Sequence, residues 1–383
     1  MVDQVPKLSR RYLMKLKSII LTALLAIFYP FALLQRVHSR RITFISLEHD
    51  HLSKDFKLIY DQLETKEDYD LQTVLFKLEP SFWGNIKYGL ACIRQLFLIQ
   101  SSRLVILDFN NFVVSKFPHK SQVKVLQLWH ATGALKKFGN EVERDYVIQH
   151  YDYALANSAF FKTIYSQAFN LPEDQVVVTG IPDNDKNFDA NFTRQTKLRL
   201  LKKYPQLVGK KVVTYAPTFR GRFGTQFNEA EIDLKYLRQE LGNDYILIYK
   251  AHPLISNSVY ANDPNVLFIK DELISNIFCV TDLLITDYSA ITIDWMAFDK
   301  PTIAYVPDLD KYARKPGLNI DYESEFPGVV VRDQSQLTGA IEVADSDLNK
   351  QKRRQFTDKV YQFTDGKSTK RVIELIDSIM FPI

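Results

Sequence analysis

Short apolar runs that alternate with amphipathic segments constrain the fold of this chain more than any other feature. The run from Leu104 to Leu107 contains no polar side chain, which is typical of a parallel strand covered on both faces. Helical patterns follow most of the other runs, so the sequence predicts an α/β fold with parallel sheets. The expected strands are residues 41–46, 73–78, 104–108, 123–129, 153–156, 176–179, 211–216, 245–250, 266–269, 283–286 and 302–305.

A polar stretch divides these strands into two groups. Residues 186–209 are first polar and then helical, and they end with Pro205 and Gly209. Helices are expected over residues 52–63 and 83–100, from the N-cap Ser158 to Ala168, and twice within residues 335–380. The expected parts are an N-terminal basic and apolar segment (1–39), a Rossmann-like acceptor domain (40–185), a connector (186–209) and a Rossmann-like donor domain with C-terminal helices (210–383).

Residues 18–34 form the one long apolar run of the sequence. Basic residues flank both ends and no small-residue cleavage site follows, so a secretory signal peptide is not expected. About 17 helical residues rise roughly 26 Å, which falls short of a hydrocarbon core of about 30 Å, and Pro30 would kink the helix. We therefore expect this helix to lie in the membrane interface and to be attracted to anionic lipids. A membrane-spanning helix and a buried structural helix are the alternatives.

The composition narrows the classes of function. Hydrophobic residues make up 46% of the 383 residues and charged residues 25%, which is typical of a globular protein. A net charge of +4 without a basic aromatic platform does not favour nucleic acid as a partner. The two cysteines, Cys92 and Cys279, lie in apolar settings without a CxxC motif, so neither a disulfide framework nor a zinc site is expected.

The stretch VKVLQLWHATGALKKFG, residues 123–139, is an expected strand that stops at a histidine. In open α/β sheets, ligands bind at the carboxyl ends of the strands. Imidazole titrates near neutral pH, so His130 is a candidate general base. The alternative is a half-buried histidine that caps a strand. Glycines that admit a close substrate and lysines that add positive charge would support the loop; they are Gly133, Lys136, Lys137 and Gly139.

Three expected strands of the second domain end in groups suited to phosphate. Thr218 and Arg220 follow the first, and a guanidinium offers a planar fork of donors. His252 is held extended before Pro253 and is placed to contact a diphosphate. Ser289 is an expected N-cap after Thr286 and Asp287, and free N–H groups at a helix start bind phosphate. A solvated arginine, a turn histidine and an ordinary cap are the alternatives when each group is taken alone.

The motifs of several other enzyme classes are missing from the sequence. Neither GxGxxG nor GxxxxGK[ST] occurs, which disfavours a dinucleotide oxidoreductase and a P-loop nucleotidase. HExxH, metal-ligand spacing of carboxylates and the GxSxG elbow are also missing. We therefore expect neither a metal nor a cofactor.

Five segments together resemble, in order and spacing, the CDP-glycerol glycerophosphotransferase family of wall teichoic acid synthesis. They are WHATGALKKFG, TGIPDND, TYAPTFRG, the His252-Pro253 pair and LLITDYSAITIDW. The resemblance extends over residues 40–365, and the chain length is similar to that of the short primase-type members. It implies a GT-B-like fold, in which two Rossmann-like domains enclose a cleft. The chain departs from the family at Asp183, where many members have an arginine.

The resemblance also implies an activity. The protein would transfer glycerol phosphate from CDP-glycerol to an undecaprenyl-diphosphate-linked ManNAc-GlcNAc disaccharide and release CMP. His130 and His252 would be catalytic, with His130 as the base, and the residues around the CDP would be Thr218, Arg220, Thr286, Asp287 and Ser289. The protein would be peripheral at the cytoplasmic face of the cell membrane.

Several alternatives stay open at the level of sequence. The chain could instead add further glycerol-phosphate or ribitol-phosphate units, or be a GT-B glycosyltransferase that uses a sugar nucleotide. A non-catalytic protein that binds a nucleotide or a membrane belongs to a different class. Homo-oligomer formation is also left open.

Overall fold

The computed structural model describes residues 7–77, 81–218, 232–250 and 266–382. The chain divides into two compact units. Unit 1 comprises Met1–Ala131, Phe138–Asp183 and Lys367–Ile383, and unit 2 comprises Thr132–Lys137 and Asn184–Gly366. This division differs from the expected domains in two places, because the last helix belongs to unit 1 and a six-residue segment after His130 belongs to unit 2.

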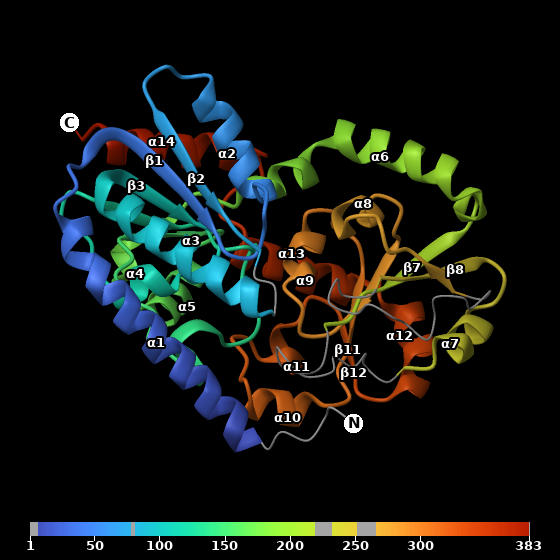
Figure 1. The fold of residues 1–383 in the computed structure, drawn as a ribbon. Coiled ribbons are helices and arrows are strands. Elements are labelled where there is room, and N and C mark those ends of the chain that lie inside the picture. The colour runs from blue at the N-terminus through green and yellow to red at the C-terminus, as the bar shows by residue number, and fades with distance from the viewer. Residues whose placement is uncertain (1–6, 78–80, 219–231, 251–265, 383) are drawn as a thin grey trace. The chain divides into compact units, whose positions relative to one another are not determined.

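A parallel sheet of six strands forms the centre of unit 1, within the part of the chain that is described (Figure 1). Its strands lie in the order β2-β1-β3-β4-β5-β6. Strand β2 begins three residues earlier than expected, because Asp70 at its start accepts a hydrogen bond of 2.7 Å from Nε of Arg41 on the neighbouring strand. The strands are β1 (His38–Ser46), β2 (Asp70–Leu75), β3 (Ser102–Leu107), β4 (Lys124–Gln127), β5 (Tyr153–Ala156) and β6 (Val176–Val178).

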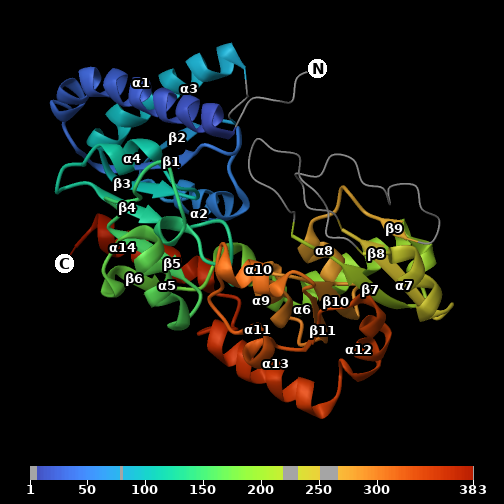
Figure 2. The same ribbon diagram turned by 90° about the horizontal axis from the view of Figure 1, so that it is seen from below.

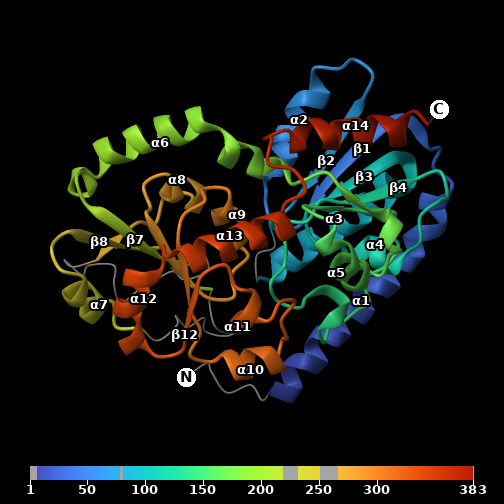
Figure 3. The same ribbon diagram turned by 180° about the vertical axis from the view of Figure 1, so that it is seen from behind.

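The helices of unit 1 cover both faces of this sheet. Helices α2 and α14 bury apolar stripes at helical spacing against it, among them Phe56 and Ile59 of α2 and Val372 and Ile376 of α14. This stripe explains why the end of the chain returns to unit 1, where α14 lies against α2 (Figure 3). The helices are α1 (Lys7–Leu33), α2 (Lys54–Glu64), α3 (Phe82–Ser101), α4 (Phe112–Lys116), α5 (Phe160–Phe169) and α14 (Ser368–Met380), with 3₁₀ turns η1 (Gly139–Glu141) and η2 (Glu173–Gln175).

Unit 2 contains a second parallel sheet, for which the described residues supply six strands in the order β12-β11-β10-β7-β8-β9. The two sheets confirm the predicted α/β fold with two Rossmann-like units. Strand β12 was not expected, since only three valines form it. The strands are β7 (Lys211–Tyr215), β8 (Tyr245–Tyr249), β9 (Leu267–Phe268), β10 (Leu283–Thr286), β11 (Thr302–Tyr305) and β12 (Val329–Val331).

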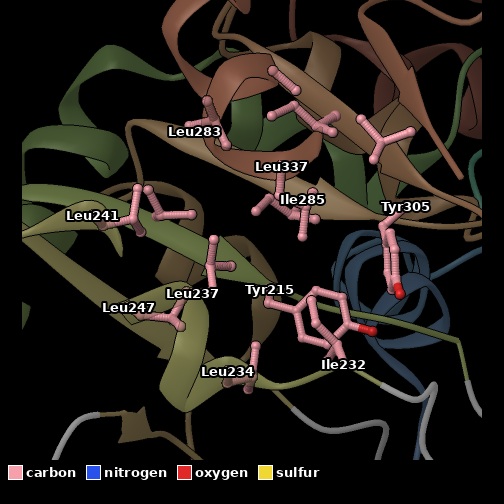
Figure 4. Close-up of a cluster of buried hydrophobic side chains, with 14 of the residues drawn as sticks. Tyr215, Ile232, Leu234, Leu237, Leu241, Leu247, Leu283, Ile285, Tyr305 and Leu337 are labelled. Atoms are coloured by element: carbon pink, nitrogen blue, oxygen red, sulfur yellow. The ribbon is translucent and has the colours of Figure 1, made fainter. Parts of the chain in front are cut away.

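The core of unit 2 forms where helices pack on one face of its sheet. Leu234 and Leu237 of α7 contact apolar side chains of the central strands, such as Tyr215 and Ile285 (Figure 4). Three helices, rather than the expected two, follow residue 335. The described helices are α6 (Ala190–Lys203), α7 (Leu234–Leu241), α8 (Ile274–Phe278), α9 (Ile291–Met296), α10 (Leu309–Arg314), α11 (Tyr322–Glu325), α12 (Leu337–Val343) and α13 (Asp347–Val360), with 3₁₀ turns η3 (Pro182–Phe188), η4 (Pro205–Leu207) and η5 (Gln334–Gln336).

The long N-terminal helix α1 packs along α3 within unit 1 (Figure 2). Leu25 and Ala32 of α1 are fully buried, and the Tyr29 hydroxyl donates a hydrogen bond of 2.7 Å to the carbonyl oxygen of Pro118. Within the described residues, the segment Lys15–Leu33 is long and apolar enough to cross a membrane by length and composition. Only 11% of that segment is buried, so the described residues leave most of its apolar surface uncovered.

Candidate active site

The order of the strands in unit 2 singles out the carboxyl ends of β7 and β10. The chain runs from β7 outward to β8 and β9 on one side and returns to β10 on the other side of β7. Neighbouring strands whose connections leave in opposite directions leave an opening at their carboxyl ends, and ligands of open α/β sheets bind there. The motifs that contain Thr218 and Asp287 follow these two strands directly.

Thr218 and Asp287 are brought together at this point. Oδ1 of Asp287 accepts a hydrogen bond of 2.9 Å from the backbone N–H of Thr218 and a second one from the Thr218 hydroxyl. The hydroxyl of Tyr322 donates a bond of 3.0 Å to the backbone carbonyl of Asp287. All three side chains are buried. The starts of the loops after β7 and β10 are therefore held together at Thr218 and Asp287.

Thr286 and Ser289 lie beside this pair, and their expected contacts with CDP stay predictions. The Thr286 hydroxyl donates a bond of 2.7 Å to the carbonyl of Ala216 and so ties β10 to the end of β7. Helix α9 begins at Ile291, its N-cap is Ala290, and Ser289 accepts only a long contact of 3.4 Å from the N–H of Ile291. The helix ends after six residues, because Asp299 adopts a left-handed conformation (φ 47°) before Pro301. The expected N-cap at Ser289 is therefore wrong, and so short a helix contributes little dipole.

The two remaining donor-side predictions, Arg220 and His252, lie outside the described residues. Their expected contacts with a diphosphate stay predictions. Asp183, where the chain departs from the family pattern, lies in unit 1 and forms an ion pair of 3.7 Å with Lys54. Its backbone N–H also donates a bond of 2.8 Å to Asp55. The acidic residue is therefore part of the contact between η3 and the start of α2.

In unit 1, His130 follows β4 at the carboxyl edge of the sheet and is exposed. Its ring stacks on Phe109 at 4.2 Å between centroids and 13° between planes, and it contacts the Trp129 ring at 4.0 Å. Two aromatic neighbours restrict the orientation of the imidazole, and the residue as a whole is exposed. This environment matches the predicted role of a general base better than that of a histidine buried to cap a strand.

Gln127, which the sequence did not single out, holds the backbone on which this arrangement depends. Its side chain is fully buried. The amide nitrogen donates a bond of 3.1 Å to the carbonyl of Phe109, and the amide oxygen accepts one of 2.9 Å from the N–H of Trp129. Trp129 has φ 65°, a left-handed conformation that costs free energy for a residue with a side chain. Gln127 thus stabilises a strained turn directly before His130.

The four residues expected to support the loop differ in what they do. Gly139 has φ 62°, and a Cβ there would come within 2.3 Å of the carbonyl oxygen of Ala168. A glycine is therefore needed at this position for the packing against α5, whether or not a substrate comes close. Gly133 is buried without a left-handed backbone. Lys136 forms an antiparallel bridge with Leu318, and the N–H of Lys137 donates a bond of 3.0 Å to Gly317. These contacts make residues 132–137 part of unit 2.

Thr132 anchors this segment in unit 2. Its hydroxyl donates a hydrogen bond to Asp294 of α9 and accepts one of 3.2 Å from Asn184. The amide of Asn184 also bonds to the hydroxyl of Tyr361 at 2.8 Å, which in turn donates to the carbonyl of Ile293 at 3.0 Å. Burial raises the pKa of Tyr361, so this hydroxyl keeps its proton. The chain therefore joins unit 2 two residues after His130.

Asp108 is a second residue that sequence reasoning missed. The sequence placed it as the last residue of an apolar strand, yet β3 ends at Leu107 and Asp108 lies just beyond, 1% exposed. Burial raises the pKa of its carboxyl to about 6, against a partial lowering by the nearby hydroxyls of Ser53 and Ser46. A carboxylate directly after a fully apolar strand was the signal available in the sequence.

Comparisons with known proteins agree on one family. A family model described as "CDP-Glycerol:Poly(glycerophosphate) glycerophosphotransferase" matches residues 27–378. A teichoic acid ribitol-phosphate primase of Bacillus spizizenii is 30% identical over 362 residues, which cover 90% of this chain and 92% of that protein. A teichoic acid glycerol-phosphate primase of Bacillus subtilis is 28% identical over 312 residues, covering 75% and 77%.

Solved structures with the same fold agree with this result. The wall teichoic acid polymerase TagF superposes with a TM-score of 0.69 at 23% identity, with 97% of each chain covered. A UDP-N-acetylglucosamine 2-epimerase superposes with a TM-score of 0.56 at 13% identity, covering 90% of this chain and 96% of the other. At these identities the likeness establishes the GT-B-like fold.

Proposed function

Because the chain belongs to the CDP-glycerol:poly(glycerophosphate) glycerophosphotransferase family, we propose that it transfers glycerol phosphate from CDP-glycerol to a lipid-diphosphate-linked disaccharide. At the level the relatives establish, it is a teichoic acid glycerol- or ribitol-phosphate transferase. The observation that carries the proposal is the family match over residues 27–378, which includes His130, Thr218 and Asp287. Priming of the acceptor with a first unit is the finer form of the proposal.

The reaction needs a base and a held donor. His130 removes the proton from an acceptor hydroxyl, whose oxygen attacks the phosphorus that carries glycerol. The bond from this phosphorus to the oxygen of CMP breaks, CMP leaves with the electron pair, and the proton passes from His130 to solvent. Phosphoryl transfer depends mainly on positioning and charge stabilisation. The linked loops of Thr218 and Asp287 position the CDP, and Arg220 and His252 are predicted to meet the charge of the leaving phosphate.

A second candidate donor is CDP-ribitol. The ribitol-phosphate primase of B. spizizenii covers more of this chain than the glycerol-phosphate primase of B. subtilis, at 90% against 75%. Both donors share the CDP group and differ only in the length of the polyol. The same unit 2 loops would therefore serve either of them.

The test is an assay of the purified full-length chain with each CDP-alditol and a short-lipid analogue of the diphosphate-linked disaccharide. We expect CMP release that requires both substrates, and the mass of the lipid product identifies the donor and the number of units added. Release of no CMP with either donor, under conditions in which CDP binds, would contradict the proposed function.

We expect Gln127→Leu to lower kcat about ten-fold while the KM for the CDP-alditol stays within about two-fold. The change removes two hydrogen bonds worth about 1 kcal/mol each from the turn that holds His130. Steady-state kinetics with varied donor measure both constants. Gln127→Glu keeps the oxygen that accepts from Trp129 and should retain more activity than the leucine variant. An equal loss in both variants would argue against positioning through this bond.

Helices α1 and α3 support the predicted membrane association. Leu24 of α1 lies 4.0 Å from a Cβ placed on Gly89 of α3, so the two helices are in contact. Each helix exposes several large apolar side chains. On α1 they include Ile19 (64%), Ile27 (64%) and Phe31 (59%), and on α3 they are Phe82 (73%), Trp83 (69%), Ile86 (41%) and Leu90 (63%). We propose that both helices enter the lipid interface together, with nearby lysines at the headgroups.

We expect Phe82→Ser combined with Trp83→Ser to weaken binding to vesicles of phosphatidylglycerol and phosphatidylethanolamine at least about ten-fold. Each aromatic side chain gains roughly 1.5–3 kcal/mol when fully buried, and part of this is lost at an interface. Co-sedimentation with the vesicles measures the change. Leu198→Ser is the matched control, because Leu198 of α6 is 59% exposed in unit 2. Unchanged binding of the α3 variant would restrict the membrane contact to α1.

A further inference from the structure

The strand order of unit 1 also contains a reversal, and the sequence motifs do not fall there. The connection from β1 leads to β2 on one side, and the chain then returns to β3 on the other side of β1. Ile45 of β1 lies opposite Leu107 of β3, so the next residues, Ser46 at the end of β1 and Asp108 just beyond β3, lie together at the carboxyl edge of the sheet. By the same topological argument that applies to β7 and β10, this is where unit 1 is built to hold a ligand.

The polar groups at this edge are buried, and within the described residues they have no hydrogen-bond partner outside their own cluster. Both carboxylate oxygens of Asp108 and the hydroxyls of Ser46 and Ser53 have no partner of normal geometry within the described residues. Ser46 and Asp108 are each 1% exposed. Ser46 lies beside Asp108 because Ile45 is opposite Leu107, and the hydroxyls of Ser46 and Ser53 lie close enough to the carboxyl to lower its pKa by hydrogen bonding. The three groups therefore form one cluster. Buried polar groups are otherwise almost always satisfied, and exceptions often mark a functional site.

The chemistry of the cluster defines what it can bind. Carboxylate oxygens accept hydrogen bonds, and therefore they need a ligand with hydroxyl or amide donors. A phosphate is disfavoured, because Asp108 is negative when ionised and the nearby Glu48 adds to the negative charge. Burial also raises the pKa of Glu48. An uncharged group rich in hydroxyls fits these requirements.

The neighbouring rings connect this cluster to the candidate base. Phe109 follows Asp108 in sequence and stacks on His130 at 4.2 Å. The ring of His49, from the segment that joins β1 to α2, meets Phe109 edge-on at 6.0 Å. Apolar ring faces beside a few aimed polar groups are the usual lining of a small-molecule site. A hydroxyl-bearing group held by Asp108 would therefore lie one aromatic residue away from the imidazole.

We propose that the carboxyl ends of β1 and β3 form a polyol- or sugar-binding subsite, in which Asp108, Ser46 and Ser53 bind ligand hydroxyl groups. The Asp108 oxygens are sealed in the described structure, so the ligand enters as the irregular segment 47–53 rearranges. The subsite rests on the proposed function for the identity of its ligand. Two sources share the chemistry: the sugar of the acceptor and the polyol of the donor.

The test uses the full-length chain in detergent and three soluble probes, which are CDP, CDP-glycerol and the methyl glycoside of the ManNAc-GlcNAc disaccharide. Titration calorimetry measures the affinity of each. We expect Asp108→Asn to lower the affinity for the disaccharide at least ten-fold and to change the affinity for CDP by less than two-fold. If CDP-glycerol rather than the disaccharide is weakened relative to CDP, the subsite belongs to the donor polyol. Unchanged affinity for both polyhydroxyl ligands overturns the proposal.

Two further variants keep the result decisive. Asp152→Asn is the matched control, since Asp152 precedes β5 at the opposite edge of the same sheet and pairs with Lys124 at 2.9 Å; it should bind all probes normally. Ser46→Ala should weaken the same ligand as Asp108→Asn about three-fold, and it replaces Asp108→Asn if that variant fails to fold. Loss of disaccharide binding in a protein that transfers no CDP-alditol would retain the subsite and reject the proposed function.

Discussion

Replacement of His130 by glutamine is expected to lower the turnover of acceptor about 10²–10⁴-fold, the usual contribution of a general base. Glutamine keeps the size and polarity of imidazole but cannot take a proton near neutral pH. His130 is exposed and stacked on Phe109, so the substitution should leave the fold of unit 1 intact. Affinity for CDP should remain within about two-fold, because the donor loops belong to unit 2. Single-turnover CMP release and a separate CDP titration measure the two quantities.

The control for this experiment is His38→Gln. His38 is also exposed in unit 1, but it begins β1 at the amino edge of the sheet. This variant should transfer glycerol phosphate at the normal rate. If His130→Gln retains full turnover, the assignment of the base is wrong. If CDP binds but neither the wild type nor the variants release CMP, the alternative of a non-catalytic nucleotide-binding protein is favoured.

Asp108→Asn is expected to make the protein more stable above pH 6, not less. Burial raises the pKa of this carboxyl from 3.8 to about 6, so the folded chain holds its proton more tightly than the unfolded chain does. As pH rises from about 4 to 6, the unfolded chain loses this proton first and the folded state becomes relatively less stable. A pKa shift of this size lowers the free energy of unfolding of the wild type by ~3 kcal/mol above pH 6. The amide variant cannot ionise and should not show this loss.

Urea unfolding at several pH values between 4 and 8 measures this effect. The free energy of unfolding of the variant minus that of the wild type should increase across the window from pH 4 to 6 and stay level above it. Asp152→Asn should show no such increase, because the pKa of Asp152 is lowered from 3.8 and its contribution changes only below about pH 4. Burial raises the pKa of Asp152, but hydrogen bonds from His119 and Lys124 outweigh this, and the net shift is downward. A flat difference for Asp108→Asn would mean that the pKa of the carboxyl is the same in the folded and the unfolded chain.

Helices α1 and α3 show how much of the structure the local sequence pattern predicts. The apolar run of residues 18–34 identified α1, and helical periodicity identified α3 to within a residue at each end. Neither pattern indicated that the two helices pack together or that Trp83 is exposed. Those facts depend on which side of each helix contacts the rest of unit 1, and residues distant in sequence decide this.

The sequence by itself determined the fold class and most of the strands. A buried parallel strand needs a continuous apolar run, and each run is visible without knowledge of its neighbours; β10 and β11 coincide with their expected bounds. The sequence also indicated His130, Thr218 and Asp287, since polar residues that stop an apolar strand stand out locally. The family resemblance followed from these same segments and is confirmed by the comparisons.

Only the tertiary structure decided which strand ends meet. Strand order follows from crossover connections and long-range packing, so the reversals at β7 and β10 and at β1 and β3 have no local signature. The roles of Gln127 and Asp108 depend on the same information, because the function of a buried amide or carboxylate is set by the groups that surround it in the fold. The return of α14 to unit 1 and the place of residues 132–137 in unit 2 were decided in the same way. Local sequence sets what each segment can form, and contacts between distant segments set what each residue can do.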